Sequence, residues 1–113
     1  MTEVSVGLSE GRYAALSAAG HTGFSESGSD VVCAAVSTLV QALHYGFIEV
    51  LKREDLRCET DREKTRITLD WRSCKDEAAL VLADTVVGSL KEIARAYPGH
   101  VRILEVPLNE MEF

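Results

Sequence analysis

The chain has 113 residues, a formal net charge of -6 and 46% hydrophobic residues. This length is typical of one domain and the apolar fraction is enough for one compact core, so we expect a single domain over residues 1–113. The negative charge repels phosphate backbones, which argues against direct nucleic-acid binding and favours a basic partner.

Membrane insertion and disulfide bonding are also not expected. We expect that no stretch approaches the roughly 20 uncharged apolar residues that a membrane-spanning helix needs, and residues 1–3 lack the basic start and apolar run of a signal peptide. We therefore expect a cytoplasmic protein with no membrane partner. The three cysteines, Cys33, Cys58 and Cys74, form no Cys-x-x-Cys pair. This odd number fits neither a disulfide framework nor a structural zinc site, so we interpret them as thiols and expect no metal and no cofactor.

The first two elements are predicted to form a β-hairpin. Apolar and polar residues alternate over residues 4–8, which is the period of a half-buried strand, and residues 9–11 supply a turn. Residues 12–20 are alanine-rich and their propensity allows a helix, but their short length and the closing Gly20 favour a return strand. Residues 23–29 hold two glycines and three serines, which predicts a mobile loop.

A long helix is predicted over residues 31–51. Asp30 is a good N-cap because its carboxylate can accept hydrogen bonds from the free N–H groups of the first turn. The first half of this helix is nearly all apolar or small. It should therefore be buried on most of its circumference, against the sheet and against a further surface such as a dimer partner.

A second hairpin, a second helix and a last strand follow. Residues 56–61 and 65–71 are predicted strands joined by a charged turn. Ser73 and Asp76 stand at capping-box spacing before a helix. The apolar residues of that helix repeat at three and four positions, namely Leu80, Ala83, Val87, Leu90, Ala94 and Tyr97.

The helix is ended by Pro98-Gly99, and residues 101–106 form the last predicted strand. The resulting order ββαββαβ predicts a two-layer α/β (α+β) fold, with two helices on one face of a mixed or antiparallel sheet of about five strands.

Cys33 and His21 are the candidates for chemistry. If Asp30 caps the helix, Cys33 is its third residue, where the helix dipole favours the thiolate over the thiol by about 0.5 to 1 kcal/mol. His21 lies 12 residues upstream, and the loop between them is long enough to bring the imidazole beside the sulfur. Such a pair could perform acyl transfer, with His21 protonating the leaving amine and free N–H groups at the helix start, including that of Cys33, holding the oxyanion. On spacing alone, however, a cysteine among valines and alanines is more often a small buried residue, and a histidine after glycine a strand-end hydrogen-bonding residue.

A motif strengthens the catalytic interpretation. Gly20-His21, followed after the loop by Gly-Ser-Asp-Val-Val-Cys-Ala-Ala-Val-Ser at residues 28–37, is similar to the signature of the ribosomal-processing cysteine protease (Prp) family. The resemblance implies a bacterial endopeptidase that removes a short N-terminal extension from ribosomal protein twenty-seven of the large subunit. It also implies a homodimer, and an apolar pocket near Cys33 for an aromatic residue of the substrate.

The resemblance assigns the catalytic pair to His21 and Cys33 and other motif positions to Gly20, Asp30 and Ser37. The family's common small apolar residue after the histidine is here Thr22, which leaves the detail of the loop open.

The supporting residues each have a plainer alternative role. Gly20 either lets the backbone approach the substrate or simply ends a strand. Asp30 either orients His21 or caps the helix, and capping is favoured. Ser37 can hydrogen-bond a helical carbonyl, which would be a structural role. The loop over residues 23–29 is either a lid over the substrate or a plain solvated loop. As a lid it would contact the substrate through Gly23, Phe24 and Gly28.

Two other function classes stay open. One is a ribosome-assembly binding module with weak or no protease activity. The other is an anion- or nucleotide-binding protein that uses the start of the first helix. The glycines and serines of the loop suggest phosphate binding, yet no lysine follows and the Walker spacing is absent.

Overall fold

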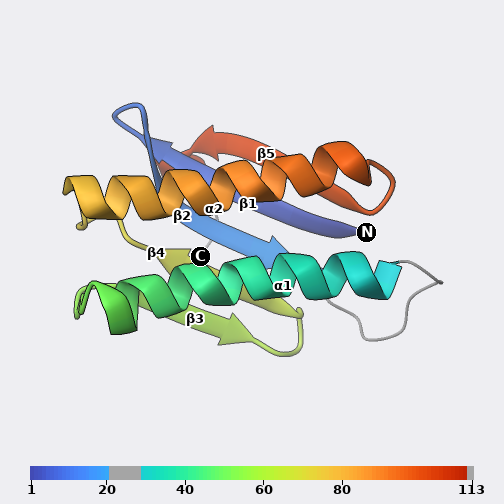
Figure 1. Ribbon diagram of the computed structural model, residues 1–113, viewed down its shortest axis with the longest axis horizontal. Coiled ribbons are helices and arrows are strands. Elements are labelled where there is room, and N and C mark those ends of the chain that lie inside the picture. Colours follow the sequence, from blue (N-terminus) through green and yellow to red (C-terminus); the bar gives the residue numbers. More distant parts are fainter. Residues whose placement is uncertain (21–28, 112–113) are drawn as a thin grey trace.

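The computed structural model describes residues 1–20 and 29–111, and the side chains of all of these except Ser29 and Asp30. The order of elements is strand, strand, helix, strand, strand, helix, strand, as predicted (Figure 1). The elements are β1 (Thr2–Ser9), β2 (Arg12–Ala19), α1 (Ser29–Tyr45), η1 (Gly46–Val50), β3 (Arg57–Asp61), β4 (Arg66–Asp70), α2 (Glu77–Ala96), β5 (Val101–Pro107) and η2 (Leu108–Glu110).

The five strands form one mixed sheet in the order β3-β4-β2-β1-β5. β1 pairs antiparallel with β2 and parallel with β5, while β4 pairs antiparallel with β2 and β3. The alanine-rich segment after the first turn is therefore a strand, β2, which lies between β1 and β4 and pairs with both. The predicted α+β class and the mixed sheet are confirmed.

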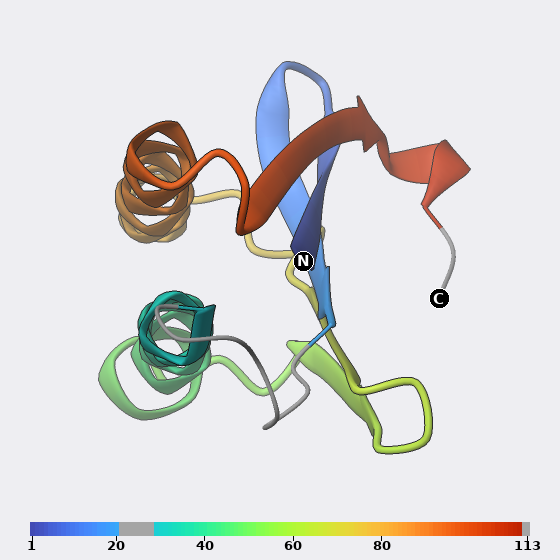
Figure 2. The ribbon, with the colours of Figure 1, turned by 90° about the vertical axis from the view of Figure 1, so that its right-hand side faces the viewer.

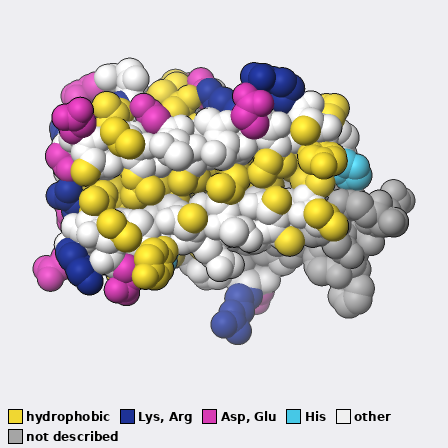
Figure 3. Space-filling view, in the orientation of Figure 1, with side chains coloured by type: hydrophobic (Ala, Val, Ile, Leu, Met, Phe, Trp, Pro, Cys, Tyr) yellow, Lys and Arg dark blue, Asp and Glu magenta, His cyan; other side chains and the backbone are white. Residues whose placement is uncertain are grey.

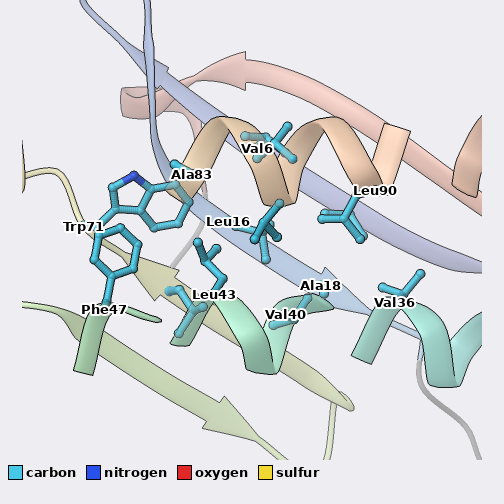
Figure 4. Close-up of a cluster of buried hydrophobic side chains, with 14 of the residues drawn as sticks. Val6, Leu16, Ala18, Val36, Val40, Leu43, Phe47, Trp71, Ala83 and Leu90 are labelled. Atoms are coloured by element: carbon cyan, nitrogen blue, oxygen red, sulfur yellow. The ribbon is translucent and has the colours of Figure 1, made fainter. Parts of the chain in front are cut away.

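Both helices cover the same face of the sheet, and η2 lies on the opposite side (Figure 2). The alternation in β1 sends Val4 and Val6 toward the helices, opposite Ala18 and Leu16 of β2. Valines from one side of α1 and from α2 complete this core (Figure 4). Burial of apolar side chains between the two layers is the main stabilising contribution to such a fold.

The predicted long helix changes geometry at its C-terminal end. The α-helical bonding stops at Tyr45, and a π-helical turn, η1, covers Gly46–Val50. The N–H of Leu51 donates to the carbonyl of Gly46 at 2.8 Å, which is the five-residue spacing of a π-turn. Gly46 sits against Leu82 of α2, where a Cβ would lie 2.7 Å from Cδ2. The absence of a side chain at this position allows the two helices to approach each other.

The start of α2 corrects the predicted capping box. Asp76 is the N-cap residue, but its side chain makes no cap hydrogen bond. Its carboxylate instead accepts a hydrogen bond from Arg53 at 2.6 Å. The Ser73 hydroxyl is directed to the carbonyl of Asp55, at 3.5 Å. The ion pair of Asp76 with Arg53, a residue in the segment that follows η1, has replaced the local cap.

The apolar stripe predicted for α2 is only partly buried. Ala83, Val87 and Leu90 are in the core, together with Ala79 and Val86, which the predicted stripe did not include. Leu80 and Tyr97 are instead exposed. The helix therefore faces the sheet through a stripe rotated slightly from the predicted one, and it leaves large apolar side chains on its outer face.

One expectation about hydropathy is wrong. The 20 residues Val31–Val50 have a mean hydropathy of 1.6, so their length and composition are sufficient for a membrane-spanning helix. In this fold the same segment is a layer of the core, since Val32, Val36 and Val40 are buried against the sheet. Core helices of compact domains commonly combine this length with this composition.

Candidate active site

Cys33 lies near the start of α1, where the helix approaches the first residues of β1. Its Sγ is 3.0 Å from Oγ1 of Thr2. The Thr2 side chain is fully buried, on the same side of β1 as Val4 and Val6, whereas Cys33 is partly exposed. The sulfur is thus held by a fixed neighbour and belongs to a residue that reaches the surface, a combination that suits a nucleophile.

Two further segments meet the start of β1 at this corner of the sheet. The N–H of Thr2 donates to the carbonyl of His100 at 2.9 Å, just before β5 begins. Gly20, directly after β2, has φ of 96°. It is packed so closely that a Cβ would lie 2.6 Å from the carbonyl oxygen of Met1 and 3.3 Å from Cα of Thr2. Figure 1 shows the N-terminus, the start of α1 and the connection from α2 to β5 at the same end of the molecule.

The start of α1 differs from the predicted one. The helix begins at Ser29, so Asp30 lies inside its first turn instead of preceding it, and Cys33 follows Ser29 by four positions. Only the first four N–H groups of a helix lack intrahelical partners, so that of Cys33 is not among them. This helix start gives no support to the expectation that this N–H holds an oxyanion, which stays a prediction. The dipole effect also falls off within the first turn and is weaker at Cys33 than predicted.

The other predicted site residues are only partly covered by the structure. Ser37 lies one turn after Cys33 on the same helix and is half-buried. His21, Gly23, Phe24 and Gly28 lie outside the described residues, and so does the side chain of Asp30. The dyad, the lid and the role of Asp30 therefore remain predictions.

The two remaining thiols have a different environment. Burial raises the pKa of the Cys74 thiol, and the negative charge of Asp55 adds to the shift. Burial also raises the pKa of Cys58, on the edge strand β3, with a contribution from the charge of Glu59. Within residues 1–20 and 29–111, no group of three or more His, Cys, Asp or Glu side chains is placed to hold a metal ion.

Thr2 is the residue of this corner that the sequence interpretation missed. Its signal was a polar side chain on a face that is otherwise apolar, in the alternation of Thr2 with Val4 and Val6. A cavity of about 240 Å³ lies elsewhere, on the open face of the sheet beside Ser5, Ser17 and Met111, and Cys33 does not line it.

Comparisons with known proteins identify the family of this chain. The family model described as cysteine protease Prp matches residues 1–102. The crystal structure of SMU.848 from Streptococcus mutans is 26% identical, with a TM-score of 0.81 over 95% of each chain. The essential ribosomal processing protease Prp from S. aureus, in complex with a substrate peptide, is 18% identical, with a TM-score of 0.83 over 94% of this chain and 100% of that one. No curated protein sequence matches the chain. Because the family model spans nearly the whole chain, including the corner around Thr2 and Cys33, this protein is a cysteine peptidase that belongs to the cysteine protease Prp family.

Proposed function

We propose that this peptidase removes the N-terminal extension of ribosomal protein twenty-seven of the large subunit, with Cys33 as nucleophile and His21 as its base. The observation that carries the proposal is the convergence of Gly20 and Cys33 on Thr2. Gly20 is bonded to His21, and consecutive Cα atoms are about 3.8 Å apart. The residue that precedes the proposed base therefore lies at the same corner of the sheet as the sulfur.

The proposed chemistry is acyl transfer in two stages. The Cys33 thiolate attacks the carbonyl carbon of the scissile peptide, and the electrons of the C=O bond move to the oxygen. When the carbonyl re-forms, the C–N bond breaks and the imidazolium of His21 protonates the leaving amine. In the second stage the same imidazole takes a proton from water, whose oxygen attacks the carbonyl carbon of the thioester. The C–S bond then breaks, the Cys33 thiolate leaves, and the acid product loses its proton to solvent, which restores the thiolate–imidazolium pair.

Charge and surroundings support a basic protein substrate. The net charge of -6 attracts a basic ribosomal protein, most strongly at low ionic strength. The S. aureus protease was solved with a substrate peptide, and this chain shares its fold. We place the reaction in the cytoplasm, where a ribosomal protein is made and a catalytic thiol stays reduced.

The test is mass-resolved cleavage of the full-length ribosomal protein from the same organism. The wild type, Cys33→Ala, His21→Ala and the control Cys58→Ala are compared under reducing conditions. We expect a single N-terminal cut by the wild type and the control, and no cut by the first two variants. If folded wild type leaves an extended substrate intact but still binds it, the ribosome-assembly binding module replaces the protease proposal.

We also propose that the peptidase is a homodimer joined through the outer face of its two helices. Four large apolar side chains of the two helices are exposed, namely Val31 (72%) and Tyr45 (61%) on α1 and Leu80 (42%) and Val81 (58%) on α2. Figure 3 shows apolar side chains in a band along the junction of the two helices. Continuous apolar surface of this kind marks an interaction site on a small protein.

Sedimentation velocity tests the dimer. The wild type should sediment as twice the 12.4 kDa chain, and Val81→Glu should shift it to the monomer. Arg62→Glu is the matched control, because this residue is exposed in the turn between β3 and β4, away from the helices. A wild type that stays monomeric at every concentration would exclude the dimer.

A further inference from the structure

The buried hydroxyl of Thr2 faces the sulfur of Cys33. Thr2 is 0% exposed, and a buried hydroxyl without a hydrogen-bond partner is costly. The sulfur, at 3.0 Å from Oγ1, is the partner that this structure provides. In the thiol form either atom can donate, but a thiolate has no proton, so only the hydroxyl can then donate.

We propose that Thr2 is a positioning residue for the nucleophile: its hydroxyl donates a hydrogen bond to the Cys33 thiolate and holds the sulfur in one orientation. The proposal rests on the function proposed above, in which Cys33 attacks the peptide. It goes beyond the catalytic pair because it adds a donor from a different element, the first strand of the sheet.

The position of the hydroxyl is set by the sheet. Thr2 pairs with Val101 of β5, and its N–H donates to the His100 carbonyl at 2.9 Å. Met1, on its other side, is packed against Gly20. Two strands and the end of a third therefore fix the backbone of Thr2, while Cys33 is carried by α1. The hydroxyl–sulfur contact connects the helix to this frame and restricts rotation of the cysteine side chain.

The hydrogen bond has opposite effects on two measurable quantities. A donor that stabilises the thiolate increases the thiolate fraction at low pH. It also withdraws electron density from the sulfur, and the nucleophilicity of a thiolate falls as the thiolate becomes more stable. Loss of the hydroxyl should therefore move the pH–rate profile of Cys33 alkylation to higher pH without lowering its alkaline plateau. A purely structural defect would lower the plateau instead.

Other titratable groups at this corner are common to all the variants compared. The described segments that meet there carry the Met1 α-amino group and the His100 imidazole, and the Asp30 side chain and His21 lie outside the described part of the chain. Because these groups do not change, a difference between profiles reports on position 2.

The experiment measures alkylation of Cys33 by iodoacetamide between pH 5 and 10, with peptide mass mapping. It compares the wild type, Thr2→Val, which keeps the shape and removes the hydroxyl, and Thr2→Ser, which keeps the hydroxyl. Intact mass first confirms that all three begin at the same residue, and circular dichroism confirms the fold. We expect the midpoint of the Thr2→Val profile to rise by about one pH unit with an equal or higher plateau, and the Thr2→Ser profile to follow the wild type.

Coincident profiles for the wild type and Thr2→Val, or a Thr2→Ser profile displaced as far as that of Thr2→Val, would overturn the proposal. The same is true of a lower plateau with an unchanged midpoint. The assay needs no protein substrate, so it can succeed when ribosomal-protein cleavage fails. Failure of the proposed function is seen separately, as absence of the cut in the cleavage assay.

Discussion

A Cβ on Gly20 would lie 2.6 Å from the carbonyl oxygen of Met1, a distance that real Cβ atoms essentially never show. The obstacle is backbone held in the sheet, so it cannot rotate away. Gly20 also has φ of 96°, where side chains other than hydrogen are strained. This relationship connects the residue before His21 to the N-terminal strand that contacts Cys33.

Gly20→Ala should destabilise the protein by about 1–3 kcal/mol, through the strained φ and the displaced Met1 backbone. Cleavage should fall more than the folded fraction, because the entry of the chain into the proposed site shifts. Urea unfolding and the cleavage assay measure the two effects. Gly99→Ala is the control, since no atom lies within 4 Å of its Cβ position, and the interpretation fails if both variants behave alike.

Phe47→Ala should cost about 3–5 kcal/mol of unfolding free energy. The Phe47 ring stacks on Trp71 with centroids 5.5 Å apart, and both side chains are buried, so the deletion leaves a cavity between η1 and the end of β4 (Figure 4). Val50→Ala, at a position on the same turn that is mostly exposed, should change stability by less than about 0.5 kcal/mol. Equilibrium denaturation measures both, and a similar loss for the two variants would contradict this account of the packing.

Glu105→Gln should lower the free energy of unfolding at neutral pH. It should also make the free energy of unfolding fall less steeply as the pH is lowered. Hydrogen bonds from Lys91 and then from Tyr13 hold the pKa of the Glu105 carboxyl below its usual range. Because the folded pKa is lower than the unfolded one, the contribution is present above the ordinary value near 4.5 and is lost as the pH falls through the folded value.

The size of this effect is limited by exposure of the pair. The side chains of Lys91 and Glu105 are 40% and 38% exposed, so we expect their ion pair to contribute at most about 1 kcal/mol to the free energy of unfolding. Salt reduces this contribution further. Melting temperature between pH 3 and 7 is the readout. Glu92→Gln, which removes the more exposed pair with Arg95, is the control. Parallel curves for the wild type and Glu105→Gln would show that the Lys91–Glu105–Tyr13 cluster contributes no pH dependence.

The three thiols should react with iodoacetamide in the order Cys33, Cys58, Cys74 at neutral pH. Partial burial of the sulfur and the charge of Glu59 raise the pKa of Cys58, so this thiol stays protonated and reacts slowly, although the residue as a whole is exposed on the edge strand. Burial and Asp55 raise the pKa of Cys74, which is also shielded and should react only after unfolding. Peptide mass mapping over time gives the order. Modification of Cys58 as fast as Cys33 would remove the argument for a selectively reactive Cys33.

The sequence by itself determined the order of elements and the fold class, because strand and helix periodicities are local properties of the chain. Alternation placed Val4 and Val6 on the buried face of a strand, and Gly20 marked the end of the next one. The motif around Gly20 and Cys33 indicated the family, because a motif is defined by residue types and their spacing along the chain and can be recognised without knowledge of the fold.

Only the tertiary structure decided which partners the polar side chains take. Asp76 follows the rule for an N-cap, yet its carboxylate makes no cap hydrogen bond and instead pairs at 2.6 Å with Arg53, a charged partner from another segment. The outer face of α2 keeps Leu80 and Tyr97 because helix rotation is set by packing against the sheet and not by the helix alone. The contact of Thr2 with Cys33 joins residues 31 positions apart. No local pattern encodes such a distance, which is fixed by strand register and by the seating of α1 on the sheet.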